Sequence, residues 1–161
     1  MTASVSGESN HGVDRLGART ATFPHSARLL RHADFERVYK NGRRHFSASM
    51  TVFYLQRQTK SGTGKASIRP GIRVGFTVGR VLGGAVQRNR MKRRLREAVR
   101  LSKPWPVADV DIVINPKKVL LAQPFDSVLN EVRQAFVVIE KKLVRERAEE
   151  KGNSGGPKPG A

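Results

Sequence analysis

The stretches Ile72-Arg-Val-Gly-Phe-Thr-Val78 and Arg88-Asn-Arg-Met-Lys-Arg-Arg-Leu-Arg-Glu-Ala-Val-Arg100 decide the fold, because the hydrophobic period changes between them. In the first, apolar residues alternate with small or polar ones, which is the pattern of a half-buried strand. From about Gly84 to Ser102 the apolar residues recur at helical spacing and form a narrow stripe of Met91, Leu95, Ala98 and Val99. Pro104 follows and is expected to stop this helix. The sequence therefore predicts a strand followed by an amphipathic helix.

The flanking segments add further elements of both kinds. Residues 33–42 predict a short helix with Phe35, Val38 and Tyr39 on one face. Residues 50–55 and 111–115 read as strands, and the apolar positions from Phe125 to Leu143 recur every three or four residues for five turns. Because the strands 50–55 and 72–78 are joined by a Gly- and Ser-rich loop at 59–70, we expect them to form an antiparallel pair. The order predicts an α+β fold, a two-layer sandwich with one sheet face covered by helices.

Composition divides the chain into one folded body and two ends. Residues 1–22 have scattered Gly and Ser without a hydrophobic period and are expected to form a disordered extension. Residues 151–161 contain four Gly and two Pro and are expected to form a disordered tail. The folded domain is thus predicted to span residues 23–150, a length that suits a single core.

Charge is the strongest indication of function class. The chain has 31 Lys and Arg against 13 Asp and Glu, a formal net charge of +18 and no Cys. The lack of Cys excludes disulfide scaffolds and thiolate chemistry, and such a basic balance is typical of nucleic-acid binders. No apolar run approaches the ~20 residues of a membrane span, and no signal peptide is recognisable. We therefore expect a cytoplasmic protein that binds nucleic acid, with no membrane partner.

The basic charge is concentrated on the predicted central helix. Residues 88–100 contain six Arg, one Lys and a single Glu. At 100° per residue, Asn89, Arg93, Arg96 and Arg100 lie opposite the apolar stripe, with Arg90 and Lys92 on its flanks. A solvated helix face would normally mix the two signs of charge. The preference for Arg over Lys instead favours a planar grip on phosphate groups.

Four aromatic residues near the first helix have two interpretations. They are Phe35, Tyr39, Phe53 and Tyr54. As helix and strand aromatics they fit a core. Alternatively, some of them line a groove in which unpaired bases stack, with positive charge from Arg37, Lys40, Arg43 and Arg44.

The residues contain no self-sufficient catalytic constellation. Gly62-Thr-Gly-Lys-Ala-Ser67 lacks the Gly and the hydroxyl residue that a phosphate loop needs at positions 59 and 66. His11, His25, His32 and His45 do not have metal-ligand spacing. Asp109 and Asp111 flank a strand, where such a pair is more often structural than an acid and base. We expect neither a metal site on the protein nor a small-molecule substrate.

Several motifs, in order, resemble the bacterial ribonuclease P protein subunit over roughly residues 23–145. The most specific is the Arg-Asn-Arg-x-Lys-Arg box after a Val-Gly-x-x-Val strand. The motifs are Phe23-Pro24, Arg28-Leu-Leu-Arg-His-Ala-Asp-Phe-Glu-Arg-Val-Tyr39, Gly42-Arg-Arg44, Val74-Gly-Phe-Thr-Val78, Arg88-Asn-Arg-Met-Lys-Arg93 and Asp111-Ile-Val-Ile114. The resemblance implies an α-β-β-β-α-β-α order like that of the second domain of a small-subunit ribosomal protein. It also implies a left-handed β-α-β crossover, against the ~98% right-handed rule.

The resemblance further implies a ribonucleoprotein that removes the 5′ leader of precursor tRNA. The catalytic centre and its Mg²⁺ ions would belong to the RNA subunit, so the partners would be this RNA and precursor tRNA. Carried over by position, the residues that would face RNA are Arg80, Arg88, Asn89, Arg90, Lys92, Arg93 and Arg96. The residues that would line the leader cleft are Phe35, Arg37, Tyr39 and one of Phe53 or Tyr54.

Two positions depart from the family pattern. The family usually has two basic residues where this chain has Arg80 and Val81, and a Ser is common where His32 stands. Two other function classes compete with the resemblance. One is a structural RNA-binding protein of the ribosomal type, which the composition alone would favour, and the other is a DNA-binding module built on the basic helix.

Overall fold

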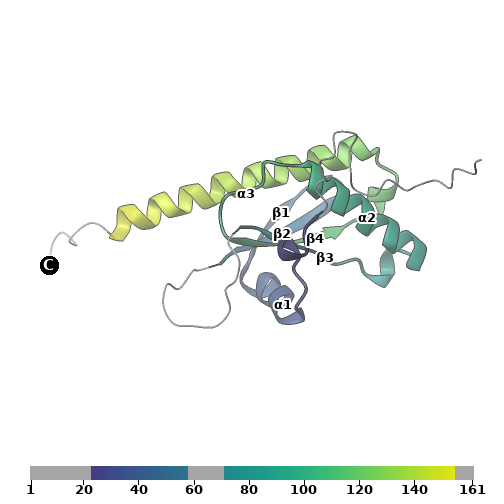
Figure 1. The fold of residues 1–161 in the computed structure, drawn as a ribbon, viewed down its shortest axis with the longest axis horizontal. Coiled ribbons are helices and arrows are strands. Elements are labelled where there is room, and N and C mark those ends of the chain that lie inside the picture. Colours follow the sequence, from purple (N-terminus) through teal and green to yellow (C-terminus); the bar gives the residue numbers. More distant parts are fainter. Residues whose placement is uncertain (1–22, 58–70, 155–161) are drawn as a thin grey trace, which may run out of the picture.

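The computed structural model describes residues 23–57 and 71–154. The predicted extension at 1–22, the loop at 59–70 with Gly62–Ser67, and the last seven residues of the predicted tail lie outside this part. Within it the elements run, in chain order, η1 His25–Ala27, α1 His32–Asn41, β1 Arg43–Phe46, β2 Met50–Gln56, β3 Arg73–Phe76, η2 Arg80–Leu82, α2 Ala85–Leu101, β4 Val110–Pro116, η3 Lys118–Leu121 and α3 Phe125–Ser154. This confirms the α+β class and the predicted element order (Figure 1).

The described strands form one mixed sheet in the order β1-β2-β4-β3. Strand β2 is antiparallel to both β1 and β4, while β3 is parallel to β4. The expected pairing of 50–55 with 72–78 is therefore wrong, because β4 lies between these two strands. Parallel strands need a long crossover connection, and α2 supplies it between β3 and β4. The short strand β1, with its exposed Arg43 and Arg44, carries no apolar alternation that the sequence pattern could detect.

The main core lies between the sheet and the two long helices. The apolar stripe of α2 is fully buried, as are Val132, Phe136 and Ile139 of α3. The strands contribute the side chains of one face, among them Val52, Tyr54, Val74, Ile112 and Ile114. Figure 1 shows α2 and α3 together on this side of the sheet. The predicted helix-covered face is thus confirmed.

Helix α1 lies across the opposite face, where sequence analysis expected no cover (Figure 1). Its Val38 packs with Leu29 and Val113 in a small second cluster. Gly75 allows the close approach, since a Cβ there would lie 2.5 Å from the Phe35 ring. Gly42 also leaves no room for a Cβ at the end of the helix, where it would lie 2.3 Å from the carbonyl oxygen of Val38 and 2.7 Å from that of Tyr54 in β2. With three buried apolar residues, the cluster under α1 is much smaller than the main core under α2 and α3.

Helix α3 is longer than its apolar period predicts. It has 30 residues, or about 45 Å at 1.5 Å per residue, and projects beyond the sheet (Figure 1). It continues to Ser154, so the domain boundary expected at residue 150 lies inside a helix. None of the helices in the described ranges is long and apolar enough to cross a bilayer.

Candidate nucleic-acid interface

Helix α2 separates its apolar and basic residues as the sequence predicts. Met91, Leu95, Ala98 and Val99 are at most 1% exposed. Of the predicted RNA-facing residues that lie on α2, Asn89, Arg90, Arg93 and Arg96 are exposed, while Arg88 and Lys92 are half-buried. The helix thus presents a row of guanidinium groups on the side that does not pack, which is the arrangement that a polyanion requires.

The connection that precedes α2 places another cation near the N-terminus of this helix. Arg80 is exposed in η2, immediately before the turn that leads into the helix. Gly83 has φ +139°, a backbone conformation that favours Gly. The backbone N–H of Gly84 donates to the side-chain oxygen of Gln87 at 2.7 Å, which caps the helix. Arg80 therefore lies next to the positive end of the α2 dipole.

Two arginines of α2 form hydrogen bonds or ion pairs with other residues of the protein. Arg94 donates from both terminal nitrogens, at 2.6 Å each, to the carbonyl oxygens of Leu120 and Gln123, and so fastens η3 to the helix. Arg100, which sequence analysis placed on the exposed face, forms an ion pair with Glu97. Hydrogen bonding from Arg100 lowers the pKa of Glu97. The dense basic run is thus partly structural.

This division predicts opposite effects for neighbouring substitutions. Arg93→Ala should leave the free energy of unfolding within about 0.5 kcal/mol of the parent and make the log–log salt dependence of RNA affinity shallower by about 0.7–0.9, one phosphate contact. Arg94→Ala should lose about 1–3 kcal/mol of stability, because its two charged hydrogen bonds disappear, with the slope unchanged. Urea unfolding and RNA titrations at several salt concentrations measure both quantities. The same slope change for both variants would contradict the assignment.

The aromatic residues form a second surface on the α1 side of the sheet. The rings of Tyr39 and Phe53 meet edge to face with centroids 4.8 Å apart. The Arg44 guanidinium carbon lies 5.5 Å from the centre of the Phe53 ring. Phe35, Tyr39 and Phe53 are all half-buried around the small α1 cluster. We call Phe35, Tyr39, Phe53 and Arg44 the aromatic face.

Tyr54 does not belong to the aromatic face, because neighbouring residues of β2 point to opposite sides of the sheet. Phe53 packs toward α1, whereas Tyr54 is 2% exposed and belongs to the core on the opposite side of the sheet. Successive residues of a strand point to opposite faces, so only one of the two can serve. Of the alternatives that sequence analysis left open, the structure places Phe53 beside Tyr39.

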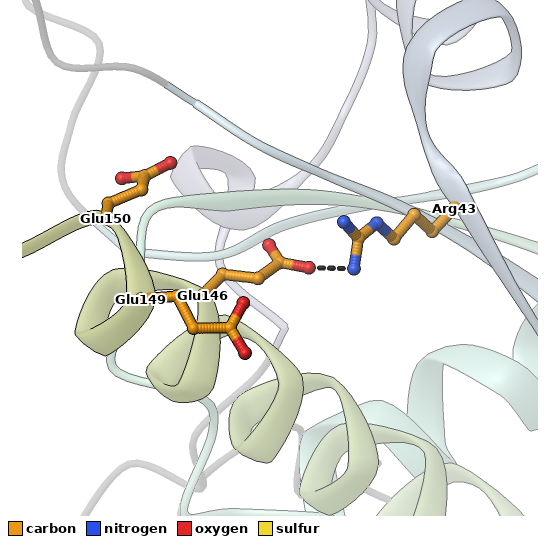
Figure 2. Close-up of a pocket in the computed structure, with 4 residues that line it drawn as sticks. All are labelled: Arg43, Glu146, Glu149 and Glu150. Atoms are coloured by element: carbon orange, nitrogen blue, oxygen red, sulfur yellow. Dashed lines mark ion pairs between the residues drawn. The ribbon is translucent and has the colours of Figure 1, made fainter. Parts of the chain in front are cut away.

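The cations expected around the first helix are divided in the same way. Arg37 forms an ion pair with Asp34 of its own helix. Arg43 points to the other side and forms an ion pair with Glu146 of α3, next to Glu149 and Glu150 (Figure 2). The expectation that Arg43 supplies charge to the aromatic face is therefore wrong. Arg44 remains beside the rings.

A buried ion network lies at one end of this sheet face. Asp111, with its side chain 1% exposed, accepts hydrogen bonds from Arg57 Nη1 at 2.7 Å, Arg73 Nε at 2.8 Å and Arg73 Nη2 at 2.7 Å. These bonds to Asp111 raise the pKa of Arg73. Asp109 accepts from the backbone N–H of Gly71 at 2.6 Å. The structural interpretation of the two aspartates is supported. Sequence analysis missed Arg57 and Arg73, since no local pattern links residues so far apart.

The comparison with known families decides between the remaining function classes. A model of the ribonuclease P protein family, described as Ribonuclease P, matches residues 23–140. This chain belongs to that family. It is therefore a component of ribonuclease P, a tRNA-processing ribonucleoprotein, and membership implies association with the ribonuclease P RNA.

Relatives and solved structures agree with this assignment. The chain is 38% identical over 109 residues to a ribonuclease P protein component of Symbiobacterium thermophilum, covering 68% of this chain and 87% of the relative. It is 33% identical over 133 residues to that of Bartonella quintana, covering 82% and 94%. The structure matches the Staphylococcus aureus RNase P protein with a TM-score of 0.56 and 25% identity, covering 71% and 95%. The Thermotoga maritima protein gives the same TM-score and identity, covering 68% and 94%.

Proposed function

We propose that this protein binds the catalytic RNA of ribonuclease P through the exposed side of α2 and the single-stranded 5′ leader of precursor tRNA along the aromatic face. The observation that carries the proposal is the two-sided division of α2, in which four exposed residues, Asn89, Arg90, Arg93 and Arg96, lie opposite a buried stripe. Phosphate groups of a folded RNA are a matching partner for such a row.

The leader proposal rests on a different surface. Unpaired bases bind proteins by stacking on aromatic side chains beside positive charge. The aromatic face has these two components, because Arg44 lies over the Phe53 ring and Tyr39 meets its edge. It lies on the side of the sheet opposite to the core that α2 covers. One molecule can therefore contact the catalytic RNA and the substrate with separate surfaces.

The protein assists the reaction, and the RNA carries it out. Two buried carboxylates on the α1 side of the sheet form ion pairs with arginines: Asp111 with Arg57 and Arg73, and Asp34 with Arg37. Among the described residues, His, Asp and Glu side chains do not gather in groups of three or more suited to a metal. As the family resemblance implies, we assign the Mg²⁺ ions of the cleavage reaction to the RNA subunit, where they would activate the attacking water.

Addition of the protein to the catalytic RNA tests this function against the structural RNA-binding alternative. At low Mg²⁺ concentration the protein should accelerate removal of the leader from precursor tRNA. A ribosomal-type binding protein would bind RNA without changing the cleavage rate. Binding without acceleration over a range of Mg²⁺ concentrations would overturn the proposal.

The leader contact is tested by Phe53→Ala. Since stacking of a base on an aromatic ring contributes ~1–3 kcal/mol, this variant in the holoenzyme should bind precursor tRNA about 5- to 100-fold more weakly. Mature tRNA, which has no leader, should bind as before. Equilibrium binding of the two tRNAs gives the precursor-to-mature affinity ratio.

Phe125→Ala is the matched control, because Phe125 is also half-buried but packs against the main core. It should lower stability without changing the affinity ratio. Equal ratios for both variants and the parent would place Phe53 outside the leader site.

A further inference from the structure

The surfaces that the leader would use come from different elements and must be held in register. Phe35 and Tyr39 belong to α1, and Phe53 belongs to β2. The fully buried apolar contact between α1 and the sheet is small: Val38 of α1 packs with Val113 of β4 and with Leu29, which precedes the helix. Apolar burial has no direction. This contact alone therefore does not fix the rotation of α1 about its own axis or its height above the sheet. Directional contacts must do this.

Such contacts exist at the beginning of α1. Arg73 of β3 places Nε and Nη2 on the two carboxylate oxygens of Asp111, a bidentate fork that fixes the guanidinium plane. Its remaining nitrogen, Nη1, lies 3.5 Å from Asp34 Oδ2. The Asp34 side chain is only 9% exposed. The helix is thus tied to the buried Asp111 through a single rigid arginine.

A second polar attachment holds the other end of α1. The Tyr39 hydroxyl forms hydrogen bonds with Thr77 Oγ1 at 2.7 Å and with Asn115 Oδ1 at 2.8 Å. Asp34 and Tyr39 are separated by about 7.5 Å along the helix axis, and Gly75 receives the Phe35 ring between them. Two attachments and one close contact define both the height and the rotation of the helix.

We infer that Asp34 is a positioning residue, which acts through Arg73 to hold α1 at the height and rotation that the aromatic face needs for binding the leader. This inference rests on the proposed function and deepens it. In this role Asp34 does not itself contact the RNA. Its carboxylate sets where Phe35 and Tyr39 lie relative to Phe53.

Asp34 is the residue to substitute, because it is the outermost member of the ion network around Asp111. The Arg57 and Arg73 contacts with Asp111 do not depend on it, so Asp34→Asn keeps the inner network, the size of the side chain and an oxygen that accepts a hydrogen bond from Arg37. Glu36→Gln is the matched control. It removes the same charge from the same helix, where Glu36 is 69% exposed and pairs with the exposed His32.

The experiment measures the precursor-to-mature tRNA affinity ratio in the holoenzyme built from the full chain. Asp34→Asn should lower this ratio about three- to tenfold, a part of the loss that removal of a stacking ring gives. The affinity of the protein for the catalytic RNA should not change, because α2 packs on the opposite side of the sheet. Glu36→Gln should retain the parent ratio. Ring-proton chemical shifts of Phe53, which depend on the Tyr39 ring, should move in Asp34→Asn alone.

The outcomes separate the inference from the function on which it rests. A parent ratio in Asp34→Asn together with a lowered ratio in Phe53→Ala overturns the positioning role. A merely structural role would reduce binding of the catalytic RNA and of both tRNAs in proportion to the unfolded fraction, leaving the ratio unchanged, and would also overturn it. If Phe53→Ala itself keeps the parent ratio, the proposed leader site is wrong, and the inference fails with it.

Discussion

The combined replacement of Arg90, Arg93 and Arg96 by Gln is expected to reduce the affinity for the catalytic RNA by roughly 50- to 150-fold at 0.15 M salt. All three side chains are exposed on α2. Each phosphate contact contributes about 0.7–0.9 to the log–log salt slope, so three lost contacts should make it shallower by about 2.1–2.7. The difference from the parent should vanish near 1 M salt. RNA titrations between 0.1 and 1 M salt, on the order of five concentrations, measure this.

A variant with the same change in net charge serves as the control. Lys141, Arg145 and Arg147 are exposed on α3, and their replacement by Gln should change affinity much less, because only long-range charge is lost and salt screens it. An equal loss in the two triple variants would mean that the affinity depends on total charge. In that case α2 would not be the RNA interface.

The largest effect on stability is expected for Asp111→Ala. Asp111 is fully buried between Arg57 and Arg73, whose side chains are 7% and 17% exposed. Removing one partner from a buried ion network leaves charge without compensation, at a cost of about 3–5 kcal/mol. Urea unfolding followed by circular dichroism should show a lower midpoint with an unchanged slope.

Two further variants serve as controls for the stability loss in Asp111→Ala. Glu150→Gln on the exposed part of α3 should change stability by no more than about 0.5 kcal/mol. Asp111→Asn should be intermediate, since the amide still accepts a hydrogen bond but no longer neutralises either guanidinium. A loss below about 1 kcal/mol for Asp111→Ala would show that water solvates Arg57 and Arg73 once the carboxylate is gone.

Features that repeat with a local period were predictable from the residues alone. The apolar stripe of α2, its row of Arg side chains and the apolar face of α3 follow from 3.6-residue spacing. The alternation at 72–78 likewise identified β3. The basic composition indicated the class of partner, since net charge needs no knowledge of the fold. Because β1 has no apolar alternation, periodicity did not reveal this strand. The family resemblance supplied it, by implying three strands between the first two helices.

Pairings between distant residues were decided only by the tertiary structure. Strand β4 lies between β2 and β3, so the expected hairpin does not exist. The same sheet directs Phe53 toward α1 and Tyr54 into the core, and packing of the helices brings Arg43 to Glu146 and Arg94 to the carbonyl oxygens of Leu120 and Gln123. Arg57, Arg73 and Asp111 form an ion network although they are far apart in the chain. Sequence alone determined which segments form amphipathic helices and where the basic residues are concentrated, because those patterns are local. Which of the charged and aromatic side chains remain for RNA depended on strand order and helix docking, because these bring together residues whose separation carries no local period.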